Sequence, residues 1–310
     1  MALGRPLVTA FLCTFLSVST LTTFVASPAP AEEPPPFIGW SQIMPPLTYQ
    51  YNPTSADDCV AGRVSCVKKT VQDMQRRFTR LADSCDHDAV FALSYLRTTQ
   101  EYLRATQEPG FFLDPSFVNH QDVVFARMYF NAYDDWASGR VERVPPAWRV
   151  ALQAADAKQV SGSGNLLLGI NAHVQRDLPF ALAAIGMTTE SGVSRKRDHD
   201  KVNEILNRVV RPLMQEEAAR FDPQMEAIKT PYGIGYAGLL QTLVAWRETA
   251  WRNAERLVVA PNAAAKDAVS AQIEEYAALS ARSIVAGTAY QPPLTTTAAR
   301  DAHCAAHGAG

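Results

Sequence analysis

The stretch Gly164–Pro179, GNLLLGINAHVQRDLP, is an apolar helical run that one imidazole and one carboxylate interrupt. At 3.6 residues per turn, Leu166, Ile170, His173 and Asp177 fall on a single face of the helix. His173 and Asp177 therefore point toward the core, where an unpaired polar group is costly. The pair needs a partner, and either a bound metal ion or a hydrogen-bond network would supply one.

Helical periodicity continues on both sides of this stretch, whereas alternating β-branched runs are almost absent. The connections between the helical segments are short, which is typical of one antiparallel bundle. The sequence therefore predicts an all-α domain, a single compact multi-helix bundle of about eight helices. The expected helices are Arg63–Leu81, Asp86–Thr106, a third capped by Asp114-Pro115 and ending near Ser138, a short one opened by Pro145-Pro146, Gly164–Ile185, Asp198–Ala219, Gly235–Val259 and Ala263–Ala286.

The N-terminus has the pattern of a secretory signal peptide. Arg5-Pro6 precedes the uncharged run LVTAFLCTFLSVSTLTTFVA, and an Ala/Pro-rich segment follows. Cleavage is expected at Ala29-Pro30-Ala31, with Ala26 or Ser27 as the rival position. Because the run is nearly long enough to span a bilayer, an uncleaved anchor is the alternative.

The predicted domain limits follow from these boundaries. Residues 1–31 form the signal peptide, 32–56 an extended Pro-rich segment, 57–290 the all-α domain and 291–310 a loose C-terminal tail. No stretch after the signal peptide is apolar enough to cross a membrane, so the mature protein is expected to be secreted, extracellular or attached to the cell envelope.

Four cysteines remain after export, and an even number in an oxidising compartment favours two disulfides. Three connectivities are open. Pairing Cys59 with Cys66 and Cys85 with Cys304 is preferred, because the second bond would tie down the C-terminal tail. A four-cysteine zinc site is disfavoured, since the spacing CxxC is absent.

Charge and motifs exclude several classes of function. With 29 Lys and Arg against 31 Asp and Glu, the net charge of −2 gives no electrostatic case for nucleic acid or for an anionic membrane surface. The sequence contains no GxSxG, HExxH, P-loop or GxGxxG motif. A small-molecule or lipid-like substrate is the remaining expectation.

Four of the six histidines lie close to an aspartate, each on a helix face that tends toward the core. A His/Asp cluster from several helices is how bundles build metal sites, and these ligands suit zinc, manganese or iron rather than calcium. The candidate metal ligands are His87, His120, His173, Asp177 and His199. In such a site a metal-bound water would attack a phosphoester substrate, and Asp122 or Asp200 would take the proton of that water. Arg127 would bind the phosphate group of the substrate.

Structural roles compete with this interpretation. Asp86 and Asp198 stand where helices begin and can cap free backbone N–H groups. Asp177 can cap a new segment starting at Leu178-Pro179. His120 can be a hydrogen-bonded first-turn residue. A hydrolase should gather the four histidines around one pocket, whereas a structural network would leave them in separate places.

Two functions therefore remain open. One is a metal-dependent hydrolase of phosphoester substrates. The other is a non-catalytic secreted binding or cell-envelope protein whose His/Asp pairs are structural.

Most of the mature chain resembles an uncharacterised, domain-of-unknown-function family of exported bacterial proteins. The resemblance spans about Asn52–Ala286 and implies a secreted helical protein without supplying an activity. It is carried by the segments DDCVAGRVSCV, CDHDAVFALSYLRTT, FVNHQDVVFARMYF, VPPAWRVAL, GNLLLGINAHVQRDLP and DHDKVN.

A second resemblance is local. LGINAHVQRDLP is similar to the LGxxxHxxxDxxxPxH segment of helical zinc-dependent phospholipases C and P1-type nucleases. It implies that His173 and Asp177 ligate zinc. The final Pro and His of that segment fall at Ala181 and Ala183 here, and the N-terminal ligand of those enzymes has no counterpart.

Overall fold

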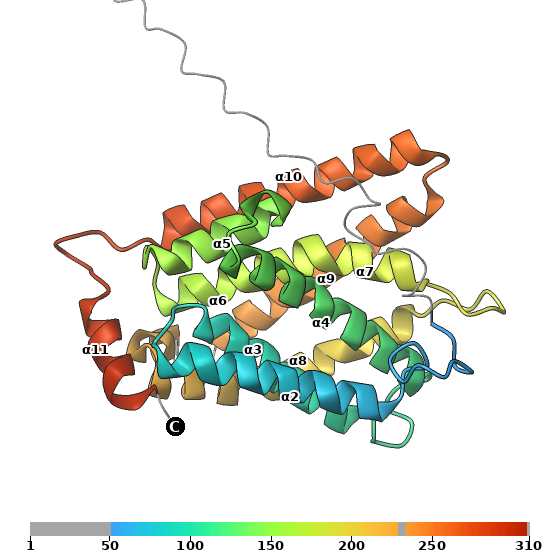
Figure 1. Cartoon of the computed structure of the whole chain (residues 1–310), viewed down its shortest axis with the longest axis horizontal. Helices are drawn as coiled ribbons and strands as arrows, with labels where there is room; N and C mark the ends of the chain where they lie inside the picture. Colours follow the sequence, from blue (N-terminus) through green and yellow to red (C-terminus); the bar gives the residue numbers. More distant parts are fainter. Residues whose placement is uncertain (1–50, 229–233, 309–310) are drawn as a thin grey trace, which may run out of the picture. The chain divides into compact units, whose positions relative to one another are not determined.

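The computed structural model describes residues 51–228 and 234–308 (Figure 1). Those residues are helical apart from connecting segments and two isolated bridges, so the predicted all-α class is confirmed. The expected signal peptide, and residues 32–50 of the expected Pro-rich segment, lie outside the described residues. The helices are α2 (Val64–Asp83), α3 (Ala89–Ala105), α4 (Pro115–Ala137), α5 (Pro146–Asp156), α6 (Gly162–Ile170), α7 (Leu178–Ile185), α8 (Lys196–Arg220), α9 (Ile234–Val259), α10 (Ala263–Thr288) and α11 (Ala298–His307), with short helical segments η1 (Val141–Arg143), η2 (Asn171–Asp177) and η3 (Pro223–Ile228).

Capping residues set several of the helix starts. Asp114 accepts a hydrogen bond from the backbone N–H of Phe117 at 3.0 Å, and Pro115 occupies the first turn, as the sequence predicts for α4. Asn262 caps α10 in the same way, at 2.9 Å from the backbone nitrogen of Ala265. Gly139, with φ of +74°, follows the end of α4.

The stretch Gly164–Pro179 is helical throughout, but it is not one regular α-helix. Between α6 and α7 the segment η2 is π-helical. Pro179 has no backbone N–H, and in a regular helix its ring would clash with the carbonyl four residues earlier. A π-helical turn just before the proline lets the chain pass it without a break.

The segment η2 lies in the middle of the fold. It contacts α4, α5, α6, α7, α9 and α10, while α3 packs against α2, α6 and α8. Residues of η2 are therefore surrounded on several sides, and His173 and Asp177 are both buried. The predicted core orientation of this pair is confirmed.

Residues Ala298–His307, in the segment expected to be a loose C-terminal tail, form the helix α11 (Figure 1). The preferred pairing is present: Cys59–Cys66 and Cys85–Cys304, with Cα atoms 5.2 and 5.8 Å apart. The second disulfide holds α11 in place, and Nε2 of His87 lies 3.0 Å from a carboxylate oxygen of Asp301. Within residues 51–228 and 234–308, no helix is long and apolar enough to span a membrane.

Candidate functional site

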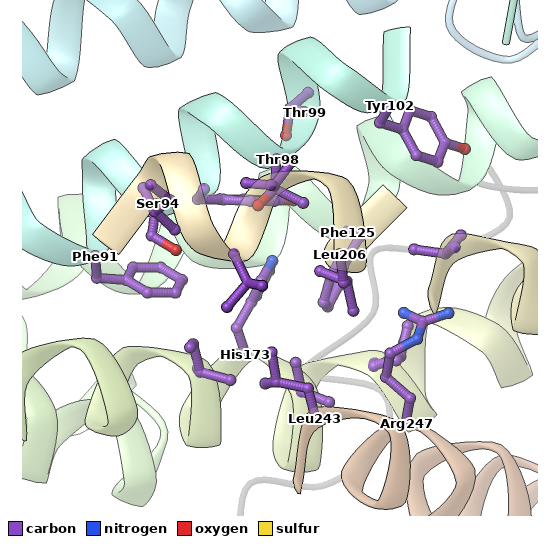
Figure 2. A pocket seen from close by; sticks show the side chains of 18 of the residues that line it. Phe91, Ser94, Thr98, Thr99, Tyr102, Phe125, His173, Leu206, Leu243 and Arg247 are labelled. Carbon is purple, nitrogen blue, oxygen red and sulfur yellow. The ribbon is translucent and has the colours of Figure 1, made fainter. Parts of the chain in front are cut away.

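A cavity of about 120 Å³ lies among the helices around η2. Its wall is mainly aliphatic and aromatic. Figure 2 shows Phe91, Ser94, Thr98, Thr99 and Tyr102 of α3 along one side, opposite His173, Leu243 and Arg247. The remaining lining comes from α4 (Gln121, Asp122, Phe125), α6 (Leu166, Ile170), η2 (Val174), α7 (Leu178), α8 (Val202, Leu206, Val209, Val210, Leu213, Met214), α9 (Leu239) and a further residue of α3 (Tyr95).

Four residues that line the cavity each have one buried polar atom without a hydrogen-bond partner in the described part of the chain. These atoms are Oη of Tyr95, Oγ1 of Thr99, Oδ2 of Asp122 and Nε2 of His173. All four are buried, and most buried polar atoms in folded proteins are paired. These four residues, which surround a single apolar cavity, therefore hold polar atoms whose hydrogen bonds the described chain does not supply.

His173 is fixed by a buried hydrogen-bond network. Its Nδ1 lies 3.0 Å from Oδ2 of Asp177, which also accepts a hydrogen bond from the indole of Trp148 at 2.8 Å. The other oxygen of Asp177 accepts from Arg176 at 2.8 Å. Because the carboxylate accepts, Nδ1 of His173 carries the proton and Nε2 is left as an acceptor. Burial lowers the pKa of His173, which favours this neutral form.

Aromatic rings determine the position of the imidazole. The ring of Phe125 stacks on His173 with centroids 3.5 Å apart, and Tyr95 meets it edge-on at 4.5 Å. Trp148, which binds Asp177, lies 6.0 Å from the imidazole centroid. The imidazole is therefore held in one orientation.

The acid in the cavity wall is shifted toward its neutral form. Burial raises the pKa of Asp122 to about 7, and burial also raises the pKa of Tyr95. A protonated carboxyl and two hydroxyls can donate hydrogen bonds, while Nε2 of His173 accepts one. Together these groups suit a hydroxyl or carbonyl group of a ligand.

The other predicted metal ligands lie in different surroundings. His87 bonds to Asp301 and to Arg300, and burial lowers its pKa to about 4. Nδ1 of His120 lies 2.8 Å from the carbonyl of Cys59. His199 lies 3.2 Å from the carbonyl of Arg247.

The described residues contain no group of three or more His, Cys, Asp or Glu that could hold a metal ion. Asp177 is already bonded to Trp148, Arg176 and His173, which leaves it poorly placed to coordinate zinc. Of these four histidines, His173 lines the cavity, while His87, His120 and His199 are not among its lining residues.

The residues expected to act on a phosphoester are likewise dispersed. Asp122 lines the cavity, whereas Asp200 and Arg127 are exposed. Asp200 is bonded to Lys196 on its own helix.

The capping alternatives hold only in part. Asp86 accepts the backbone N–H of Asp88 at 2.9 Å, just before α3 begins. Asp198 instead accepts the N–H groups of Leu113 and Asp114, at 2.8 and 3.0 Å, and so links α8 to the segment before α4. Asp177 stands at the N-cap position of α7, but its side chain makes no capping hydrogen bond there.

Tyr95, Thr99 and Arg247 are among the cavity residues that were not predicted as site residues. A signal for Arg247 is present in the sequence, since Leu239, Leu243 and Arg247 are spaced four apart on one helical face. A charged residue on an apolar stripe is the same signal that singles out His173. Thr99 has no comparable signal.

Comparison with known proteins identifies a family and no activity. A family of unknown function, DUF5995, matches residues 67–287. No curated protein and no solved structure matches the chain, and the local resemblance to phospholipases C and P1-type nucleases is not supported. The match covers more than half of the sequence, and the chain therefore belongs to the DUF5995 family of unknown function.

Proposed function

We propose that this protein binds a small, largely apolar molecule that carries a polar group, in the cavity beside His173. The observation behind this proposal is that Tyr95, Thr99, Asp122 and His173, which all line one cavity, each have a buried polar atom without a partner in the described chain. A ligand hydroxyl or carbonyl would satisfy some of these atoms, while its apolar part would contact the aliphatic wall.

The size of the cavity sets the size of the ligand. A cavity of about 150 Å³ lined by Leu, Ile and Phe accommodates a benzene molecule. The volume of about 120 Å³ here, with a similar wall, fits a molecule of roughly one ring. Several lining residues are only partly buried, among them Thr98, Val202, Leu206 and Leu239, so the proposed route to solvent runs between α3, α8 and α9.

An exported location belongs to the same proposal. The two disulfides are typical of an oxidising compartment, and residues 51–228 and 234–308 contain no helix able to cross a membrane. In this proposal the protein is secreted or bound to the envelope and takes up a small molecule. His87, His120 and His199, which bond to different neighbours, have structural roles in it.

To test this, 4-methylphenol is titrated into the full mature protein and the heat of binding is measured by calorimetry. The melting temperature is measured with and without the compound. We expect a dissociation constant on the order of 1 mM or tighter and a rise in melting temperature. Val210→Phe, which fills the cavity from α8, should weaken binding roughly tenfold.

Val258→Phe provides the matched control, because Val258 is half exposed on α9 and does not line the cavity. It should bind 4-methylphenol as the wild type does. Failure of the wild-type protein to bind 4-methylphenol, or equal binding by Val210→Phe, would contradict the proposal.

A further inference from the structure

Arg247 is a buried cation in the wall of the cavity, and no carboxylate in the described part of the chain pairs with it. Its side chain lies opposite α3 in Figure 2, and the residue is 6 % exposed. Arg176 shows the usual arrangement of a buried arginine: it lies 2.8 Å from Asp177 and 2.8 Å from Glu274. Buried charges are normally paired in this way.

Neutral groups hold the guanidinium of Arg247 in place. Nε donates to the side-chain oxygen of Asn203 at 2.9 Å, and Nη2 donates to the backbone carbonyl of His199. Neither acceptor is charged, so the position of the guanidinium is set while its charge is not neutralised. Nη1 makes no hydrogen bond within residues 51–228 and 234–308.

Asp200 and Asp122 do not remove this charge. Asp200 acts on Arg247 only through space, is exposed, and is bonded to Lys196. Burial lowers the pKa of Arg247 to about 10, so the side chain still carries its proton at neutral pH. Asp122, the acid of the cavity wall, is largely uncharged in mildly acidic solution because burial raises its pKa to about 7.

An apolar surface continues directly from the charge. Leu239, Leu243 and Arg247 occupy one face of α9, and all three line the cavity. Val202 and Leu206 of α8 line it as well, on the helix that supplies Asn203 and His199. A molecule whose anionic group meets Arg247 would therefore place its apolar part against these side chains.

We propose that the ligand is a small apolar carboxylate, whose carboxylate pairs with Arg247 while its hydrocarbon part fills the cavity. This inference rests on the proposed function and specifies the chemical class of the ligand. A carboxylate matches the planar guanidinium and supplies the missing charge. A doubly charged phosphate would need further donors, and Arg247 is the cation among the residues that line the cavity in the described chain.

Benzoate and benzamide test the charge directly, because they have nearly the same size and differ in the anionic group. Each is titrated into the full mature protein at about pH 6, below the pKa of Asp122. We expect benzoate to bind roughly tenfold or more tightly than benzamide, the effect of a hydrogen bond to a charged partner.

Two substitutions locate the effect. Arg247→Met keeps a long side chain without charge and should abolish the preference for benzoate, while Arg247→Lys should retain part of it. Arg252→Met is the matched control on the same helix, since Arg252 is exposed and pairs with Glu248 and Glu255. It should leave the preference unchanged.

The outcomes separate this inference from the proposed function. Equal binding of benzoate and benzamide by the wild type would overturn the carboxylate assignment, and this result needs no variant to fold. A benzoate preference that survives Arg247→Met would overturn the role of Arg247. Binding of 4-methylphenol without any binding of benzoate would overturn the inference while the proposed function stands. If none of the three compounds binds, both proposals fall.

Discussion

Asp122 is the cavity residue whose ionisation we expect to change most directly with pH. It is 8 % exposed, one of its oxygens has no hydrogen-bond partner in the described chain, and burial raises its pKa from 3.8 to about 7. The folded protein therefore holds a proton that the unfolded chain loses at lower pH. Below pH 3.8 both states are protonated, and above about pH 7 both are ionised.

Asp122 should accordingly make the wild type less stable as the pH rises from about 4 to 7. A rise of about three units in the pKa of Asp122 corresponds to a decrease of up to about 4 kcal/mol in the free energy of unfolding over this pH range. Asp122→Asn removes the titration and keeps the shape of the side chain. We expect the stability of Asp122→Asn relative to wild type to increase over this range.

Urea unfolding of both proteins at several pH values between 4 and 8 measures the difference. Asp200→Asn is the control, because Asp200 is exposed and its pairing with Lys196 lies at the surface. Parallel stability profiles for wild type and Asp122→Asn would show that Asp122 ionises normally in the folded protein.

At the scale of the elements, the cavity depends on how closely α3 and α6 approach each other. Gly169 of α6 lies against the ring of Phe91, where an added Cβ atom would come within 2.3 Å of the ring. Phe91 in turn lines the cavity. The glycine thus permits a contact between two helices that a larger side chain would prevent.

Gly169→Ala should therefore destabilise the protein by about 1–3 kcal/mol, the usual effect of overpacking a core. This loss would occur although alanine is the better helix former by about 1 kcal/mol. Gly238→Ala in α9 is the matched control, because nothing lies within 4 Å of its added Cβ atom.

Thermal melting of the two variants separates packing from helix propensity. Gly238→Ala should match or exceed the wild type in melting temperature, while Gly169→Ala should melt lower. A rise in both melting temperatures would mean that Phe91 moves aside without cost.

At the scale of the whole described domain, one disulfide joins segments that are far apart in the chain. Cys85 precedes α3 and Cys304 lies in α11, 219 residues later. Cys59 and Cys66 are only 7 residues apart. Because the entropy that a cross-link removes from the unfolded chain grows with the length of the loop, the two disulfides should contribute unequally.

Replacing Cys85 and Cys304 together by alanine should lower the free energy of unfolding by about 5 kcal/mol on the chain-entropy scale. The double replacement of Cys59 and Cys66 is the control, with a loss smaller by about 3 kcal/mol on the same chain-entropy scale. Urea unfolding without reductant gives both values. Equal losses from the two double variants would contradict the loop-length argument.

The sequence by itself determined the helical class, most helix positions, the inward orientation of His173 and Asp177, and the preferred disulfide pairing. These features depend on local periodicity, on capping residues such as Asp114, and on the small number of ways in which four cysteines can pair. The π-helical turn before Pro179 and the helix at Ala298–His307 were missed. Both depend on tertiary contacts that hold a segment with weak local preference.

Only the tertiary structure decided which polar residues share a site. Residues of α3, α4, η2 and α9 meet at one cavity, although Tyr95 and Arg247 are far apart in the sequence. His87, His120 and His199 have the same local pattern as His173, yet each bonds to a different neighbour. Periodicity shows that a side chain faces inward, but the packing of the helices determines which other side chains it meets.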